Sequence, residues 1–166
     1  IVTVVGEAGI GKSRLVAEAR KRAEKSTKLV AWIEGRCLSY ATQVAYQVWI
    51  DALHALLETP SGTPLTDVRQ VLIRTVRTLC TNRFIHVYPM LAWLMSLPLD
   101  AEADDRLRGI NAEGLRVLAF QAVEQLLEAT AAQSPLIVVL EDLHWADAAS
   151  LDLIRHLLPL TERVRL

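Results

Sequence analysis

Apolar positions along this chain change period several times, from the β-branched runs typical of strands to the three-and-four spacing typical of helices. The chain opens with the run IVTVV, residues 1–5, and a second strand-like run, LVAWIEG, covers residues 29–35. Between them Leu15, Val16, Ala19 and Ala23 recur at helical spacing. The first 35 residues therefore predict strand, loop, helix and strand, in that order.

The middle of the chain is predicted to be helical, with a break at the turn-forming stretch TPSGTP, residues 59–64. Helical apolar faces are formed by Tyr46, Trp49, Ile50, Leu53, Leu56 and Leu57, by Val68, Leu72, Val76 and Leu79, and by Leu115, Leu118, Ala122, Val123, Leu126 and Leu127. The less regular apolar segment 89–99 predicts short helices. Pro135 is expected to end the long third helix near Ser134. We expect a helical insertion over about 44–103, after the second strand.

The stretch PLIVVLED, residues 135–142, is a nearly continuous apolar run that ends in two carboxylates. Such a run predicts a parallel strand buried on both faces. Asp147 then stands at a plausible helix N-cap. Because strands and helices alternate, we expect an α/β fold: a three-layer sandwich with a mainly parallel sheet, in which ligands bind beyond the carboxyl ends of the strands.

Composition narrows the class of protein. The 166 residues are 52% hydrophobic and 22% charged, which is enough for one substantial core, and the net charge is -1. With this net charge, no overall electrostatic field favours binding to nucleic acid or to an anionic membrane. No apolar run is long enough to span a bilayer. We therefore expect no direct binding to either. Cys37 and Cys80 have neither metal nor disulfide spacing and are expected to be small core residues in a reducing, cytoplasmic compartment.

The segment GEAGIGKSR, residues 6–14, fits the pattern G-x-x-x-x-G-K-[ST] between a predicted strand and a predicted helix. Glycines at Gly6, Gly9 and Gly11 let backbone N–H groups turn inward around phosphate oxygens. Lys12 is placed to neutralise the β and γ phosphates, and the Ser13 hydroxyl to bind Mg²⁺. The nucleotide-binding residues expected here are Gly6, Glu7, Ala8, Gly9, Ile10, Gly11, Lys12, Ser13 and Arg14.

A second site is predicted where the strand before Glu141 and Asp142 ends, since buried carboxylates need a compensating cation. One of them is expected to hold Mg²⁺ through its water shell and the other to orient or deprotonate the attacking water; their division of roles stays open. The predicted catalytic residues are thus Lys12, Glu141 and Asp142, and the metal ligands Ser13, Glu141 and Asp142. Arg36, at the end of the second strand, is near enough to approach nucleotide, but we expect it to be solvated.

Together, GEAGIGKSRL, EGRCLSY, YPMLAWL and LEDLHWAD resemble the predicted ATPase module of bacterial signalling proteins, which belongs to the AAA-related signal-transduction ATPases with numerous domains. The resemblance implies a P-loop NTPase fold, with residues 6–13 as Walker A and Glu141 and Asp142 as Walker B. It implies ATP and Mg²⁺ as cofactors and a regulatory switch as function. The expected partners are an attached output domain of cyclase or transcription-regulator type and further copies of the chain.

Two features depart from this family pattern. The first Walker B acid is usually Asp, and Glu141 is one methylene longer. The strand with the polar sensor residue is also absent from residues 1–166, which we expect to form a partial domain that is poorly stable and slow in hydrolysis by itself. His144 and Trp145 are expected to pack beneath the loop. One alternative function is a scaffold that binds ATP without cleaving it; a phosphate-transferring kinase is disfavoured because no arginine-rich lid is evident.

Overall fold

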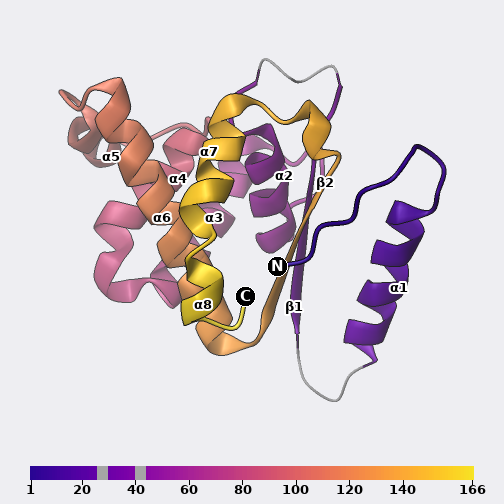
Figure 1. The fold of residues 1–166 in the computed structure, drawn as a ribbon. Helices are drawn as coiled ribbons and strands as arrows, with labels where there is room; N and C mark the ends of the chain where they lie inside the picture. Colours follow the sequence, from indigo (N-terminus) through magenta and orange to yellow (C-terminus); the bar gives the residue numbers. More distant parts are fainter. Residues whose placement is uncertain (26–29, 40–43) are drawn as a thin grey trace.

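The computed structural model describes residues 1–25, 30–39 and 44–166, and a short parallel sheet stands at its centre (Figure 1). Strand β1, Ala31–Arg36, pairs in parallel with strand β2, Leu136–Glu141. The register runs from Ala31 opposite Leu136 to Arg36 opposite Glu141. The α/β class and the parallel pairing are confirmed, and within the described residues the sheet has two strands.

Helices cover the two faces of this sheet unequally. Helix α1, Lys12–Glu24, lies on one face, and the remaining helices gather on the other (Figure 1). Those helices are α2 Gln47–Leu56, α3 Leu65–Leu79, α4 Phe84–Leu94, α5 Ala101–Leu107, α6 Ala112–Gln133, α7 Ala148–Leu157 and α8 Leu160–Arg163, with 3₁₀ turns at Thr81–Arg83 and Leu143–Trp145. None of the helices in the described residues is both long and apolar enough to cross a bilayer.

The apolar core lies on the side of the sheet that carries most of the helices. The predicted face of α3 is confirmed there, since Val68, Leu72 and Val76 are fully buried; on α6 most of the predicted face is also covered, but Leu118 is exposed. Helix α6 ends at Gln133, just before Ser134 and Pro135, as predicted. The segment predicted as short helices is instead largely the C-terminal half of α4, which begins at Phe84 and contains a proline. The predicted insertion falls on α2 to α5, and its status as an insertion stays a prediction.

Helix α2 packs closely on β1 because residue 35 is a glycine. A Cβ built on Gly35 would lie 2.1 Å from the Val48 carbonyl oxygen and 3.1 Å from the Ala52 Cβ. Any side chain at this position would collide with the helix backbone, so the glycine permits the two elements to touch.

A polar network joins α3, α4 and α5. Arg69 donates from Nε to the Tyr88 hydroxyl at 2.9 Å and from Nη2 to Asp100 Oδ2 at 2.8 Å. Asp100 is also the N-cap of α5, since its Oδ1 accepts from the Ala103 amide at 2.9 Å. That backbone hydrogen bond, followed by the bond from Arg69, lowers the pKa of Asp100 below its ordinary value.

The predicted strand over residues 1–5 is wrong for this structure. These residues are rich in β-branched side chains but do not form a strand, and all of them are exposed, with Val2 at 89%. A strand exists only where a neighbour completes its ladder of hydrogen bonds, and among the described residues no other strand pairs with this one. Helix α1, which follows, likewise has no fully buried residue.

The expectation that β2 is buried on both faces is also wrong. Only Leu136 is buried, and the residues from Ile137 to Glu141 are partly exposed. Strand β1 covers one edge of β2. On the edge away from β1, the Leu136 amide donates to the Arg165 carbonyl at 2.8 Å, so the C-terminal residues approach β2 only at its beginning.

Candidate functional site

The loop before α1 has the backbone conformation that its glycines predict at two positions. Gly9 and Gly11 have φ angles of 83° and 101°, a region that favours glycine, and a Cβ built on either meets nothing within 4 Å. Gly6 is different, because it does not have a positive φ; a Cβ there would lie 3.0 Å from the Ile10 Cγ2. The loop is therefore open around Gly9 and Gly11, and it leads into helix α1.

The nine residues predicted to bind nucleotide form this loop and the first turn of α1. Six of them, Gly6, Glu7, Ala8, Gly9, Ile10 and Gly11, form the loop, and Lys12, Ser13 and Arg14 begin the helix. No side chain caps the N-terminus of α1, and no acidic residue stands in its first turn. The positive end of the helix dipole is therefore not neutralised locally.

The ammonium group of Lys12 folds back over its own loop. Its Nζ donates to the Gly6 carbonyl at 2.8 Å and to the Glu7 carbonyl at 2.9 Å. The ammonium group of this lysine thus bridges two carbonyl oxygens at the start of the loop. Two neutral carbonyl oxygens are weaker partners for an ammonium than a charged oxygen.

The two predicted Walker B acids differ in environment. Glu141 is the last residue of β2, and its side chain is 16% exposed. Asp142 follows in the left-handed region, with φ 57°, and its side chain is 45% exposed. This strained conformation starts the 3₁₀ turn Leu143–Trp145, in which the Trp145 amide donates to the Asp142 carbonyl at 2.9 Å.

Arg36, predicted to be solvated, instead pairs with Glu141 across the sheet. Its Nε donates to Glu141 Oε2 at 3.0 Å, and its Nη2 donates to the same oxygen. The Arg36 side chain remains 54% exposed, and its Nε lies 3.9 Å from Asp142 Oδ2. The hydrogen bond to Glu141 raises the pKa of Arg36 above its ordinary value. Sequence reasoning missed this pair, since 105 residues separate its members.

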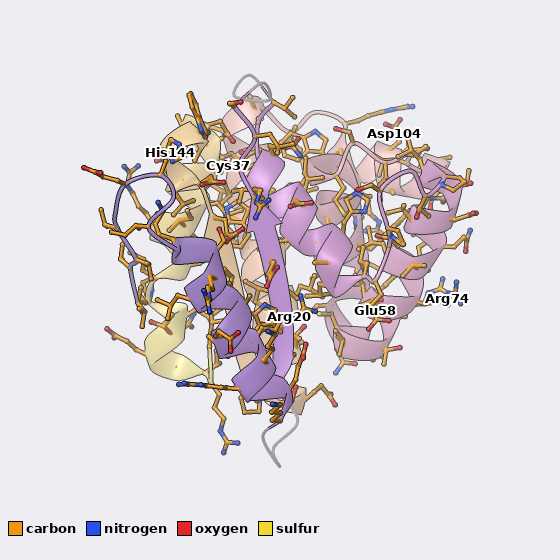
Figure 2. The ribbon with its side chains drawn as sticks, turned by 90° about the vertical axis from the view of Figure 1, so that its right-hand side faces the viewer. Arg20, Cys37, Glu58, Arg74, Asp104 and His144 are labelled. Atoms are coloured by element: carbon orange, nitrogen blue, oxygen red, sulfur yellow. The ribbon has the colours of Figure 1, made fainter. Side chains whose placement is uncertain are left out.

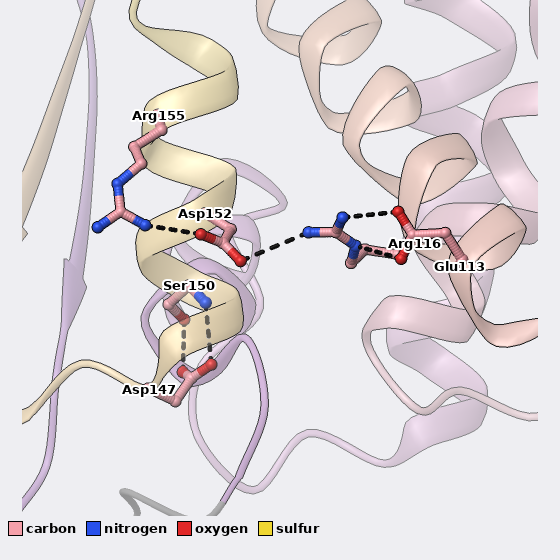
Figure 3. Close-up of polar contacts among 6 residues, drawn as sticks. All are labelled: Glu113, Arg116, Asp147, Ser150, Asp152 and Arg155. Atoms are coloured by element: carbon pink, nitrogen blue, oxygen red, sulfur yellow. Dashed lines mark hydrogen bonds and ion pairs between the residues drawn. The ribbon is translucent and has the colours of Figure 1, made fainter.

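Asp147, the last residue of LEDLHWAD, caps α7 as predicted and also holds α2. Its Oδ1 accepts from the Ser150 amide at 2.9 Å and from the Tyr46 amide at 3.2 Å, while Oδ2 accepts from the Ser150 hydroxyl at 2.6 Å. Figure 3 shows the two bonds to Ser150 at the start of α7. Trp49 adds a bond from Nε1 to the Ser150 carbonyl at 3.2 Å. This carboxylate is therefore a structural clamp between α2 and α7.

The same close-up shows how α6 is joined to α7. Arg116 of α6 donates to Glu113 on its own helix and, at 3.4 Å, to Asp152 of α7. Asp152 also accepts from Arg155 at 2.7 Å. Arg116 is thus committed to carboxylates of these two helices.

His144 and Trp145 do not pack beneath the loop, contrary to expectation. Both are exposed, Trp145 at 44%, and their rings lie against each other at 5.0 Å between centroids. The short turn that carries them therefore lies at the surface, after the end of β2.

The loop before α1 and the carboxyl end of β2 lie toward the same end of the molecule (Figures 1 and 2). Figure 2 shows α1 in front of β1 with Arg20 facing it, and Cys37 and His144 near the upper end. Arg20 of α1 forms an ion pair of 3.6 Å with Glu34 of β1. Among the described residues, no hydrogen bond or ion pair joins residues 6–14 to Glu141 or Asp142.

A phosphate loop between an extended segment and a helix, beside a parallel strand that ends in two acids, defines a nucleotide-binding domain of the P-loop class. The family model for the AAA ATPase domain matches residues 1–166, and the chain belongs to this family. Membership supports nucleotide binding by this domain.

A curated relative, an uncharacterized protein of Rhizobium meliloti (strain 1021), is 29% identical over 157 residues. The match covers 93% of this chain and 14% of the relative, so the chain spans about a seventh of the relative's length. No solved structure matches.

Proposed function

We propose that this chain binds ATP together with Mg²⁺ and hydrolyses it, and that it does so as a regulatory switch in a multidomain signalling protein. The observation that carries the proposal is the open loop at Gly9 and Gly11, which leads directly into an uncapped helix that carries Lys12 and Ser13. Backbone amides, a helix N-terminus and one ammonium at a single place form a binding site for a polyphosphate.

The structure fits such a ligand in two respects. The space in front of Gly9 and Gly11 is open, as their empty Cβ positions show. Lys12 can exchange its two loop carbonyls for charged phosphate oxygens, which are stronger partners. The loop amides would bind and orient the phosphates, and Lys12 would neutralise the group that leaves.

The donor set also fits a magnesium ion that arrives with the nucleotide. Among the described residues, no cluster of three or more His, Cys, Asp or Glu side chains could hold a metal by itself. Ser13 and one acid are therefore expected to complete a coordination shell whose other oxygens come from phosphates and water. When bound, the ion would neutralise charge on the phosphates.

The exposure of the two acids supports a division of roles between them. We assign Glu141, which is largely covered at the strand end, to the magnesium side, and Asp142, which is exposed and turned outward by its backbone, to the attacking water. A carboxylate that accepts a proton from water must be reachable by that water.

The regulatory part of the proposal rests on family likeness. Nucleotide would order the loop and the strand ends, and hydrolysis would release them, which would bias an attached output domain of cyclase or transcription-regulator type in the cytoplasm. Assembly with further copies of the chain belongs to the same proposal. The match to a small part of a much longer relative supports a module within a larger protein.

Calorimetric titration of the intact protein with MgATP, followed by single-turnover phosphate release, tests the proposal. Lys12→Ala should weaken ATP binding about ten- to a hundredfold, because it removes a charge-assisted contact. Asp142→Asn should leave binding intact and slow phosphate release about a hundredfold or more. Lys21→Ala is the matched control, since Lys21 is an exposed lysine of the same helix and pairs with Glu18. Binding that survives Lys12→Ala unchanged would refute the phosphate-loop assignment.

A scaffold that binds ATP without cleaving it is the second candidate, and one observation favours it. Arg36 already supplies a cation to Glu141, so the acid site is neutralised without a metal ion. The same titration decides between the two functions: tight MgATP binding without phosphate release in a single turnover would establish the scaffold.

A further inference from the structure

The Walker B acid Glu141 has a cationic partner within the protein, and the geometry of that pair has a consequence for metal binding. Both nitrogens of Arg36 that reach Glu141 bond to the same oxygen, Oε2. Glu141 is mostly covered, whereas Arg36 is about half exposed. The guanidinium therefore approaches the carboxylate from the solvent side, at the strand end to which the nucleotide site is assigned.

The backbone of Arg36 is fixed independently of its side chain. Its amide donates to Asp51 Oδ2 of α2 at 2.8 Å. One residue later, the Cys37 amide donates to the Glu141 carbonyl at 3.0 Å, which continues the ladder between the strands. The Arg36 side chain can thus leave Glu141 by rotating its own bonds, while the end of β1 stays in place.

Lys12 shows the same behaviour on the other half of the site. Its ammonium bonds to carbonyls of its own loop, just as Arg36 bonds to the acid of the neighbouring strand. Lys12 and Arg36 thus each have an oxygen partner within the protein. Because the described side chains offer no complete metal cluster, a magnesium ion would reach Glu141 only together with the phosphates.

We propose that Arg36 is the resident counter-cation of Glu141 and competes with Mg²⁺ for this carboxylate, so that binding of magnesium nucleotide must displace it. This inference rests on the proposed function, which supplies the nucleotide and the ion. Arg36 acts here through Glu141 and is not assigned a contact with the nucleotide. As a result, nucleotide binding depends less on magnesium than it would if Glu141 had no cationic partner.

The test measures the Kd of the intact protein for a non-hydrolysable ATP analogue, once in EDTA and once in saturating Mg²⁺. The Kd in EDTA divided by the Kd in Mg²⁺ gives a ratio that reports how strongly magnesium supports binding. Arg36→Gln should raise this ratio about three- to fivefold, the range expected for loss of a partly exposed ion pair, and leave the Kd in EDTA unchanged. Arg36→Lys keeps the charge but makes fewer bonds, so its ratio should fall between those of wild type and Arg36→Gln.

Two controls make the result specific to this pair. Arg20→Gln removes another exposed arginine that pairs with a carboxylate of β1, and should leave the ratio unchanged. In a Glu141→Gln background, Arg36→Gln should have no further effect on the ratio, because there is no carboxylate to compete for. Circular dichroism and melting of each variant verify folding, and Arg36→Lys carries the test if Arg36→Gln does not fold.

Each other outcome overturns the inference. Weaker binding of Arg36→Gln by equal factors in EDTA and Mg²⁺ would identify Arg36 as a phosphate contact. A lower ratio would mean that Arg36 positions Glu141 for the ion, and an unchanged ratio would mean that the pair is only structural. Wild-type protein that binds no ATP analogue under either condition would overturn the proposed function, and this inference with it.

Discussion

Replacing Gly35 with alanine should destabilise the fold by about 3 kcal/mol, because the added methyl group has no room. Its Cβ would lie 2.1 Å from the Val48 carbonyl oxygen, an atom of the α2 backbone that cannot turn away as a flexible side chain can. Overpacking of a core costs about 1–3 kcal/mol. The upper end applies here, because relief requires α2 to move as a body away from β1. Such a shift would also disturb the bond from the Arg36 amide to Asp51.

Urea unfolding of the intact protein, followed by circular dichroism, measures this loss as a lower midpoint with an unchanged slope. Gly114→Ala is the matched control, since the Cβ there would meet only side-chain atoms, Ile110 Cγ2 at 2.8 Å and Asn111 Oδ1 at 3.2 Å. Improved helix propensity offsets that contact, so the control should change stability by less than about 1 kcal/mol. If both glycine substitutions cost the same, close approach of α2 to β1 is not what requires glycine at position 35.

Two further carboxylates are expected to have separable effects on stability. Asp100→Ala removes the cap of α5 and should cost about 1 kcal/mol at pH 7. Because folding lowers the pKa of Asp100, its contribution is present above the unfolded pKa and disappears as the pH falls through the folded pKa. Urea midpoints of wild type and variant should therefore converge in acid; a constant difference would contradict this. Asp147→Ala should cost about 2 kcal/mol by uncapping α7 and freeing the Tyr46 amide, whereas Asp147→Asn should keep most of the cap, as thermal melting would show.

Local pattern was sufficient for the parts of the fold in which a helix carries its own apolar face. The periodicity of Val68, Leu72 and Val76 predicted α3, and Pro135 with the preceding residues predicted where α6 ends. The same holds for the cap at Asp147, whose bond to Ser150 spans only three residues. In each case the interactions that determine the structure join residues close together in the sequence, so a local sequence pattern is enough to predict them.

Predictions failed where the outcome depends on a distant partner. The run at residues 1–5 has strong β propensity, but a strand also needs a neighbour, and propensity does not supply one. The apolar sequence of β2 could not reveal that one edge of the strand is open. The pair of Arg36 with Glu141 joins residues 105 positions apart. Gly35 is a signal within the sequence for the packing of α2 on β1, since an isolated glycine within a strand pattern indicates close approach of another backbone.

These contacts give α2 a particular place between the helical layer and the candidate site. Its N-terminus is bound to Asp147 through the Tyr46 amide, and its Asp51 side chain holds the end of β1. One helix thus anchors both the last residue of β1 and the segment that follows β2. A movement of α2 along the sheet must break both attachments or carry both strand ends with it. Because interfaces packed this closely shift between discrete arrangements instead of deforming gradually, α2 is an element through which the helical layer and the acid site can affect each other.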